Sequence, residues 1–485
     1  MTSIKTVLLG SAAGILATGA AQAADLPVKK AAAAVQYVEV CPAFGRGFYK
    51  LPGTDICIRH FGYVKAEFYF KGSDDAAAFI HNSGGEYQPF VFQSEANDSV
   101  GYRVSARPGW DFRSPTEFGT LRAVVQLRND RTSGLANGLP PAGASSNTST
   151  RAHRAYIQWA GFLVGIAASQ FIYYDQGDLI TSIGGDPKTT TMQVTYEFSA
   201  PGGFTATIGL ENPNYSIPAL VYADTDITGT GAEYAVGPEA MWDVVGTLAI
   251  EQSWGSAKLA GAIHQISVIA VNGGGSALSN TCSFGGVSAT CATERETGWA
   301  VLAGVTFNLP QLGSGDQILL QATHSDGATA YGGVNDGADV SMTGGARDGL
   351  FAGGFLNDYG DAFASPNVTG TDIVLEKVKV TSVLGELRHY WTPMLRSNLA
   401  ASWTKVDAGP ISCATSASSG GRCDATAVDV ALNLIWGKSR QTAEIGVEVM
   451  YKTVRQDLSL GTVLPVGIDE DPELLAVGAF ISRSW

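Results

Sequence analysis

The chain has few charged residues and, after residue 23, no long apolar run. Only 16% of its 485 residues are Asp, Glu, Lys or Arg, and its formal charge is −14 at pH 7. This acidic balance argues against a nucleic-acid partner, because phosphate binding requires basic surface. A membrane-spanning helix needs about 20 apolar residues, and no later stretch supplies them. Any membrane association must therefore use β-strands closed into a barrel.

Histidine and cysteine are also scarce, with six of each. No histidine lies near a cysteine in the spacing of a zinc site, and none is grouped with a nucleophile and a carboxylate. The sequence therefore predicts no catalytic residue, no metal and no cofactor. The cysteines form three local pairs, Cys41/Cys57, Cys282/Cys291 and Cys413/Cys423. In an exported chain such close, even-numbered spacing suggests disulfides, although it does not establish their connectivity.

The first 23 residues have the pattern of a secretory signal peptide. Lys5 supplies the positive start, residues 7–17 form an apolar run, and Ala21-Gln22-Ala23 is a small-residue cleavage pattern. A membrane anchor would require a longer run without the interrupting glycines. We expect residues 1–23 to be removed, residues 24–56 to form an N-terminal segment at the base of a barrel, and residues 57–485 to form that barrel.

The most informative stretch is 101–131, which contains two extended segments joined by a turn at 114–117. In each segment apolar residues alternate with a second set rich in arginine, which is the period of a β-strand with two different faces. Such a hairpin fits a soluble sheet whose apolar face is a core. It also fits an outer-membrane barrel whose apolar face meets lipid and whose arginines line a watery lumen.

The remaining chain supports the barrel. Candidate strands cover sixteen segments, an even number as in single-chain bacterial barrels: 57–71, 99–114, 117–131, 151–160, 162–173, 188–199, 202–211, 241–254, 256–271, 296–309, 316–325, 372–392, 396–406, 425–437, 440–454 and 473–485.

Short and long connections alternate between these strands. Brief turns follow residues 114, 160, 199, 254, 309, 392 and 437, and longer Gly-, Ser-, Asn- and Asp-rich linkers lie between them. The second and third cysteine pairs fall inside two of these linkers, 272–295 and 407–424. An up-and-down barrel with short periplasmic turns and long outer loops has this rhythm, whereas a Greek-key sandwich would mix its connection lengths. A barrel of sixteen strands is too wide to be filled by side chains, so the polar face belongs inside.

The N-terminal block carries a family resemblance. Tyr37-Val38-Glu39-Val40-Cys41, Leu51-Pro52-Gly53-Thr54-Asp55-Ile56-Cys57-Ile58-Arg59 and Phe61-Gly62-Tyr63-Val64 resemble the alphaproteobacterial general porins of the Rhizobiales type. The resemblance implies an all-β, sixteen-stranded antiparallel transmembrane barrel in the outer membrane of a Gram-negative bacterium. It further implies contact with outer-membrane lipid, a homotrimer, and passive diffusion of ions and small hydrophilic solutes.

The resemblance also implies a pore constriction, because in porins the third outer loop folds into the lumen. Here that loop is 174–187, with Asp175, Asp178 and Asp186. We hypothesise that these carboxylates face a basic wall, across a gap in which opposed charges create a transverse field. Alternatively, these aspartates belong to a surface loop, where their side chains only make that loop soluble in water. The basic wall consists of Arg103, Arg107, Arg113, Arg122, Arg128 and Arg154.

Three other functions compete with a general porin. A substrate-specific channel for sugars or oligosaccharides would need a row of lumen aromatics, and Tyr156, Tyr173 and Tyr174 are few. An outer-membrane barrel enzyme would need a histidine grouped with a nucleophile. A secreted adhesin would form no pore, so conductance across a planar bilayer separates it from the channels.

Overall fold

The structure is a computed structural model. It describes residues 39–74, 77–81, 87–91, 100–134, 147–174, 179–180, 183–185, 190–213, 232–236, 240–272, 281–284, 287–290, 293–333, 360–366, 373–409, 421–438, 441–459 and 473–485. The predicted signal peptide, residues 1–23, lies outside the described residues.

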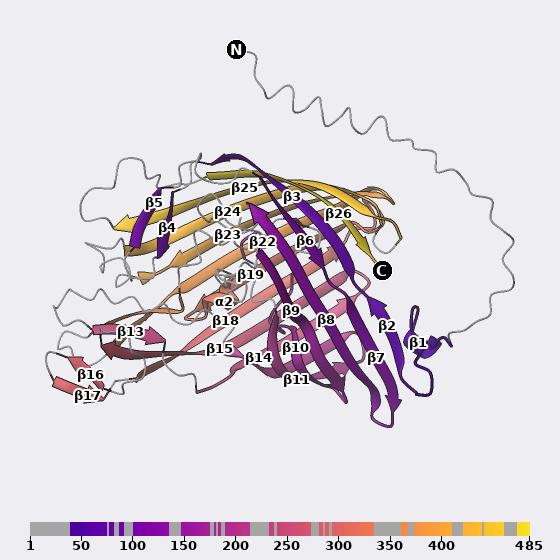
Figure 1. Ribbon diagram of the computed structural model, residues 1–485, viewed down its shortest axis with the longest axis horizontal. Coiled ribbons are helices and arrows are strands. Elements are labelled where there is room, and N and C mark those ends of the chain that lie inside the picture. The colour runs from indigo at the N-terminus through magenta and orange to yellow at the C-terminus, as the bar shows by residue number, and fades with distance from the viewer. Residues whose placement is uncertain are drawn as a thin grey trace, which may run out of the picture.

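Within this described part, sixteen antiparallel strands form a closed barrel (Figure 1). Two of the sixteen are interrupted, the first between β2 (Cys57–Phe61) and β3 (Tyr63–Asp74) and the second between β6 (Val100–Ala106) and β7 (Gly109–Thr116). The last strand, β26 (Glu473–Ser484), pairs with β3 and closes the barrel. The others are β8 (Gly119–Gly134), β9 (Asn147–Trp159), β10 (Phe162–Ala168), β11 (Thr190–Ala200), β12 (Phe204–Glu211), β14 (Asp243–Gln252), β15 (Gly255–Asn272), β18 (Thr293–Asn308), β19 (Gln317–Asp326), β22 (Lys379–Thr392), β23 (Leu395–Asp407), β24 (Gly421–Trp436) and β25 (Glu444–Ser459).

Smaller elements lie in the connections and before the first strand. They are η1 (Pro42–Phe44), β1 (Tyr49–Lys50), β4 (Ala77–His81), β5 (Tyr87–Val91), β13 (Ala232–Val236), β16 (Thr281–Phe284), β17 (Val287–Thr290), α2 (Thr329–Gly332), β20 (Ala362–Pro366) and β21 (Ile373–Lys377). Among the described residues, no helix has the length and apolar character needed to cross a membrane.

The predicted sixteen-stranded antiparallel barrel is confirmed, with differences at several strands. The predicted strand 162–173 ends earlier, because β10 stops at Ala168 and the chain then leaves the sheet. The predicted strand 372–392 is divided, because residues 373–377 form β21 and pair with β20 instead of the barrel. The predicted strand 99–114 is interrupted before Gly109, where Pro108 cannot donate a ladder hydrogen bond.

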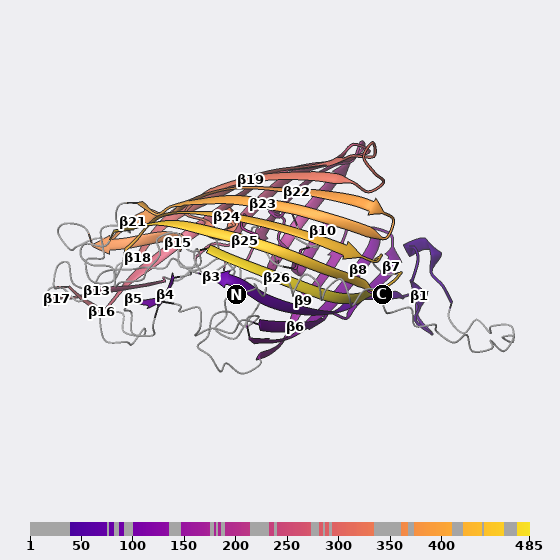
Figure 2. The same ribbon diagram turned by 90° about the horizontal axis from the view of Figure 1, so that it is seen from above.

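Short turns gather at one end of the barrel, and longer connections gather at the other (Figure 2). Exposed aromatic side chains surround this short-turn end, where amphipathic rings favour a membrane–water boundary. They are Phe118, Trp159, Phe162, Phe198, Phe204, Trp254, Phe307, Trp391, Trp436 and Trp485.

The two faces of the strands follow the predicted assignment. Large apolar side chains such as Ile208 and Leu248 are 62% and 61% exposed on the outer surface. Polar side chains on the opposite parity are enclosed, including Glu67, Arg103 and Asp111. Apolar groups therefore cover the outside of the barrel and polar groups line its interior, the reverse of a soluble protein.

Gly62 marks the point where the first strand bends. Its φ is +150°, and a Cβ at this position would lie 2.3 Å from the carbonyl oxygen of Arg107. The Gly62 N–H and carbonyl exchange hydrogen bonds with the backbone of Trp485, the residue after β26. Only glycine fits this conformation and this close approach, so Gly62 lets the interrupted strand stay paired on both sides.

Candidate pore-lining site

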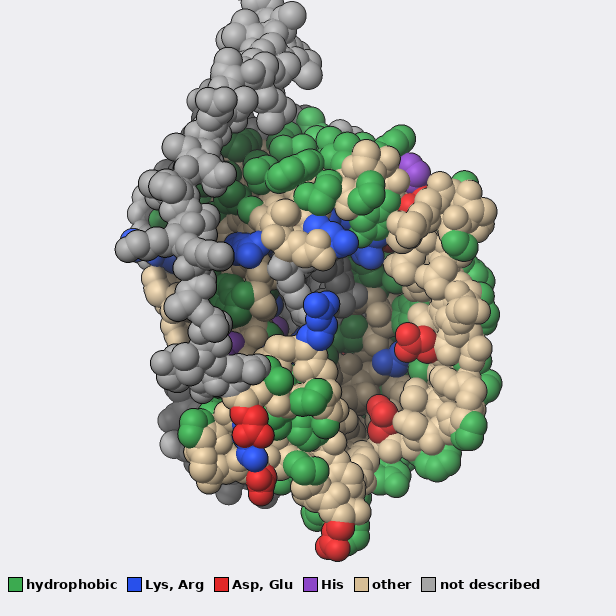
Figure 3. Space-filling model, turned by 90° about the vertical axis from the view of Figure 1, so that its right-hand side faces the viewer, with side chains coloured by type: hydrophobic (Ala, Val, Ile, Leu, Met, Phe, Trp, Pro, Cys, Tyr) green, Lys and Arg blue, Asp and Glu red, His purple; other side chains and the backbone are tan. Residues whose placement is uncertain are grey.

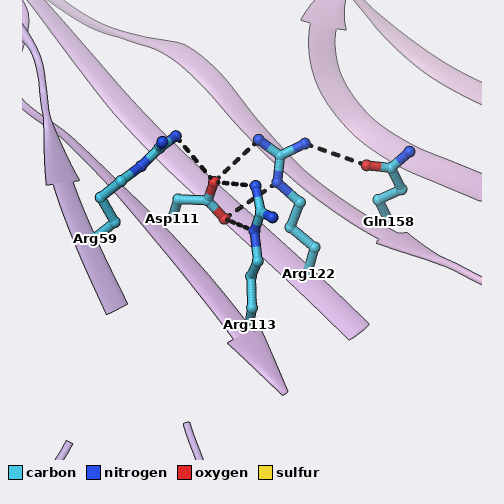
Figure 4. A network of polar contacts seen from close by, with 5 residues as sticks. All are labelled: Arg59, Asp111, Arg113, Arg122 and Gln158. Atoms are coloured by element: carbon cyan, nitrogen blue, oxygen red, sulfur yellow. Dashed lines mark hydrogen bonds and ion pairs between the residues drawn. The ribbon is translucent and has the colours of Figure 1, made fainter. Parts of the chain in front are cut away.

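Three arginines converge on one carboxylate near the short-turn end of the lumen (Figure 4). Arg113 and Arg122 face each other across the β7–β8 hairpin, and each donates two hydrogen bonds to Asp111 at 2.9–3.1 Å. Arg59, on β2, donates a further bond to Asp111 Oδ2 at 3.4 Å. We call Arg59, Asp111, Arg113 and Arg122 the mouth cluster. Its three guanidinium charges are opposed by one carboxylate charge, so the cluster carries net positive charge.

The mouth cluster is open to water on one side. The Asp111 side chain is fully buried, whereas the side chains of Arg59, Arg113 and Arg122 are 31%, 24% and 28% exposed. Arg122 also donates to Gln158 Oε1 at 3.3 Å and lies 5.7 Å from the ring centroid of Tyr156. Viewed from the short-turn end, Lys and Arg side chains border the hollow together with some Asp and Glu side chains, while hydrophobic side chains gather on the outer margin (Figure 3).

The other four predicted arginines lie deeper, and we call Arg103, Arg107, Arg128 and Arg154 the mid-wall group. Arg128 follows Arg122 by six positions on β8, which corresponds to roughly 20 Å along a strand. Arg107 contacts His153 Nε2 at 3.2 Å, and Arg128 bonds to Asp130. The six predicted arginines therefore occupy one continuous wall, on β6 to β9, but in two groups at different depths.

Arg103 differs from the rest because it is a buried ion-pair partner. Its Nε donates to Glu67 Oε2 at 2.5 Å, and its side chain is 2% exposed. Lys65 also pairs with Glu67, at 2.8 Å. Arg154 is only half-buried, and within the described residues it has no carboxylate at ion-pair distance. The charge of Arg103 is therefore buried in an ion pair that stabilises the barrel wall. The charge of Arg154 is partly exposed, where a solute could approach it.

The described residues between β10 and β11 contact barrel strands other than those of this basic wall. We call residues 171–174, 179–180 and 183–185 the inner segment. The hydroxyl of Tyr174 donates to Glu386 on β22. The backbone N–H of Ile180 donates to Glu448 Oε2 at 2.9 Å, and that of Gly184 donates to Asp429 Oδ2 at 2.6 Å. Buried carboxylates on β22, β24 and β25 therefore anchor the inner segment.

Apolar contacts add to this anchoring. Leu179 and Ile183 are 1% exposed and pack against Leu384, Ala400 and Ala431 on the inward side of the barrel. Burial of two such side chains contributes about 1.5–3 kcal/mol each. Asp175, Asp178 and Asp186, the predicted acidic residues of this loop, lie outside the described residues.

A second inward element was not predicted from the sequence, which indicated an outer loop at 326–371. Helix α2 is fully buried, and the hydroxyl of its Tyr331 donates to Asp243 Oδ2 at 2.8 Å. Asp361 accepts hydrogen bonds from Thr329 and lies 3.3 Å from His264 Nε2. Burial, together with the charges of Glu211 and Asp243, raises the pKa of Tyr331 well above its usual value, so its hydroxyl stays a donor.

Comparison with known proteins agrees with the barrel and the polar lumen described above. The family model described as the Porin subfamily matches residues 25–460. The chain belongs to the porin family. Porin Omp2b of Brucella melitensis biotype 1 is 32% identical over 344 residues, covering 68% of this chain and 86% of that protein. Porin Omp2b of Brucella canis is 32% identical over 354 residues, with the same coverage.

A solved structure supports the fold of this porin. The outer membrane channel DcaP of Acinetobacter baumannii superimposes with a TM-score of 0.54 and 16% sequence identity, covering 90% of this chain and 99% of that one. Together, the family and the barrel make this protein a porin channel of the Gram-negative outer membrane. The porin relatives are channels and not enzymes.

One of the three predicted cysteine pairs is seen as a disulfide in this porin. Cys41 and Cys57 are bonded, with their Cα atoms 6.2 Å apart. Cys282 lies on β16, but its side chain and the whole of Cys291 lie outside the described residues. The pair Cys282/Cys291 therefore stays a prediction.

Cys423 differs from its predicted position. The sequence placed it in the outer linker 407–424, before a strand beginning at 425, and this placement is wrong because β24 begins at Gly421 and includes Cys423. The physical reason is a register shift: Gly421 and Arg422 still pair with β25, and the regular ladder resumes at Ala425. Cys413 and the side chain of Cys423 lie outside the described residues. The disulfide predicted between Cys413 and Cys423 is therefore not confirmed and stays a prediction.

The turn between β18 and β19 contains a polar site that the sequence did not reveal. Asp316 accepts a hydrogen bond from the Tyr390 backbone N–H at 2.8 Å and contacts His389 Nδ1 at 2.6 Å. Desolvation raises the pKa of Asp316, but these two contacts outweigh it and hold the pKa below its usual value. The ionised carboxylate fixes β22 against the turn.

Proposed function

We propose that this porin is a passive pore for ions and small hydrophilic solutes, with its narrow part between the basic wall and the third loop. The observation that carries this proposal is the unequal exposure of charge inside the barrel. The arginines of the mouth cluster are about one-quarter to one-third exposed, whereas Glu448 and Asp429 are 1% and 0% exposed beneath the inner segment. Solutes in the lumen therefore meet guanidinium charge more than wall carboxylate.

Asp175, Asp178 and Asp186 belong to this proposal as the facing acidic row. The neighbours of these residues support it, because Tyr174 and Leu179 are buried inside the lumen and the chain between them is short. Opposed rows of charge order the intervening water and orient dipolar solutes. Apolar solutes are slowed because they cannot replace that water favourably.

The proposal extends to the assembled protein. We infer a cleaved signal peptide at residues 1–23, an N-terminal segment at 24–56 that sits at the barrel base, and a homotrimer in outer-membrane lipid. The apolar outer surface supports contact with lipid, and the family resemblance supports the trimer. Chemical cross-linking in detergent, with mass spectrometry of the mature chain, tests these three inferences.

A substrate-specific sugar channel is the second candidate, and the lumen favours it less. Such a channel needs aromatic rings along the solute path. The Tyr173 hydroxyl is instead engaged with Ser256 and Thr306, which holds the inner segment to the barrel. The Tyr156 ring lies beneath Arg122.

Planar-bilayer recording of the purified porin tests the proposed function. A passive pore gives single-channel conductance that rises in proportion to salt concentration, with no block by neutral sugars. Saturating conductance, together with block by a maltooligosaccharide, would instead indicate a substrate-specific channel. A preparation that inserts and never conducts would contradict both.

A further inference from the structure

The segment before the first barrel strand is a small closed unit. Residues 39–57 fold back on themselves, because the Cys41–Cys57 disulfide joins their ends and β1 pairs with β2. The Cys41 backbone N–H donates to the Phe48 carbonyl at 3.0 Å, and Lys50 donates to Glu39 at 2.8 Å. We call this unit the N-terminal clip.

Strand register places one side of the clip toward the lumen. Tyr49 pairs with Ile58, and its ring stacks on His60, which belongs to the same side of β2. Arg59 pairs with Asp111, and both belong to the opposite side, which faces the lumen. Because successive strand residues alternate, Phe48 shares the side of Arg59 and Asp111. The clip therefore reaches the pore through Phe48.

Phe48 contacts two members of the mouth cluster. Its ring centroid lies 5.0 Å from the Arg59 guanidinium carbon and 4.7 Å from that of Arg113. The ring is 2% exposed and packs with Cys41, Cys57 and Phe44. The disulfide thus lies directly behind the ring that contacts the arginines.

This contact has an electrostatic consequence. Arg59, Arg113 and Arg122 share the charge of Asp111 and repel one another, so without support their side chains would spread into water. The negative face of an aromatic ring attracts guanidinium groups. Phe48 therefore holds two of the three positive charges in fixed positions at the short-turn mouth.

We propose that the N-terminal clip is a specificity-determining part of the pore. By holding Phe48 on Arg59 and Arg113, the Cys41–Cys57 disulfide fixes both the field and the width of the mouth. Phe48 is a positioning residue, acting on solutes through the arginines. This inference rests on the proposed function, because it requires solutes to pass the mouth cluster.

The test compares four variants with the wild-type porin in planar bilayers under a KCl gradient. Phe48→Ala removes the ring, and Cys41→Ser with Cys57→Ser removes the bond behind it. Arg113→Gln removes one charge directly and serves as the reference. Tyr49→Phe alters the opposite side of the same clip, where it loses a hydrogen bond to His60, and it is the matched control.

Phe48→Ala and the double serine variant are expected to raise single-channel conductance. They are also expected to change the K⁺/Cl⁻ permeability ratio toward K⁺ by about two-fold, in the direction of Arg113→Gln and by a smaller amount. Tyr49→Phe should match the wild type. If Arg113→Gln changes the permeability ratio while Phe48→Ala and the double serine variant do not, the clip only stabilises the N-terminal segment and the inference is overturned.

A second measurement covers variants that fail to insert. Dithiothreitol added after wild-type channels have inserted replaces the Cys41–Cys57 bond with two thiols, while the reagent is oxidised to its cyclic disulfide. The same change in permeability ratio is expected, and it should be absent in any double serine channels that do insert. An unchanged ratio after confirmed reduction would overturn the inference, whereas a wild type without conductance would overturn the proposed function.

Discussion

The two sides of the lumen use charge in different ways. On the side formed by β2 and the basic wall of β6 to β9, the arginines of the mouth cluster outnumber the carboxylate of Asp111 and stay partly exposed. On the opposite side, which we call the anchoring wall, Glu386, Asp429 and Glu448 are almost fully buried and accept hydrogen bonds from the inner segment. The difference indicates that these three carboxylates position a loop, while the exposed arginines remain available to solutes.

The largest expected effect comes from releasing the inner segment from the anchoring wall. Leu179→Asp combined with Ile183→Asp places two charges in an apolar contact, which costs several kcal/mol per charge. The segment should leave the wall, and single-channel conductance should rise. The barrel strands should be unaffected, because neither residue belongs to one.

The control for this release is Leu179→Val with Ile183→Val, which keeps the contact apolar. It should conduct like the wild type. Equal conductance in the aspartate and valine variants would show that the inner segment does not limit the pore.

A second prediction separates the buried and the exposed arginines of the basic wall. Arg103→Gln removes a cation that pairs with the buried Glu67 and leaves Lys65, so the free energy of unfolding should fall by about 3 kcal/mol. Arg113→Gln removes a partly exposed charge and should change that free energy by less than about 1 kcal/mol. Urea titration in detergent measures both, and similar losses for the two variants would contradict the distinction.

The smallest expected effect concerns acid and the β18–β19 turn. The pKa of Asp316 is lower in the folded state than in the unfolded chain. Its stabilisation is therefore fully present above the unfolded pKa of about 4 and is lost as pH falls through the folded pKa. At pH 7, Asp316→Asn should lower the unfolding temperature by about 2 °C.

The unfolding temperatures of Asp316→Asn and the wild type are also compared at acidic pH. At a pH of about 2.5, below the unfolded pKa, the difference between Asp316→Asn and the wild type should shrink. A difference that grew as the pH fell would show that the carboxylate does not act in its ionised form.

Much of the barrel could be predicted because each strand has one face in lipid and one in water. That constraint imposes alternation on every strand, and it predicted that Arg103, Arg113 and Arg122 lie on the lumen side. The pairing of Asp111 with Arg113 could also be anticipated, since both occupy the same face of β7. The ion pair of Arg103 with Glu67 could not be anticipated. Glu67 lies on β3, and the register between β3 and β6 depends on how the barrel closes.

The positions of helix α2 and of the N-terminal clip could not be predicted from the sequence, for a different reason. Helix α2 and Asp361 lie in a long Gly- and Asp-rich connection without periodicity, so composition indicated only a surface loop. Their position depends on contacts with Asp243 and His264, which are distant in sequence. The N-terminal clip was visible as a cysteine pair, but the contact of Phe48 with Arg113 required the fold.

The start of β24 shows the same limit on a smaller scale. Residues 421–424 have no alternation of apolar and polar side chains, so the sequence assigned Cys423 to a linker. The strand nevertheless extends through it, because backbone pairing with β25 resumes beyond the register shift. Backbone hydrogen bonds of this kind leave no pattern in the side chains.

The most direct test of this account is the reversal potential of Arg113→Gln/Arg122→Gln channels across a KCl gradient. These substitutions remove two of the three positive charges at the mouth and leave Asp111 beside Arg59. Relative to the wild type, the reversal potential should move toward that of K⁺. An unchanged reversal potential, in channels that insert and conduct normally, would contradict the claim that solutes pass these arginines.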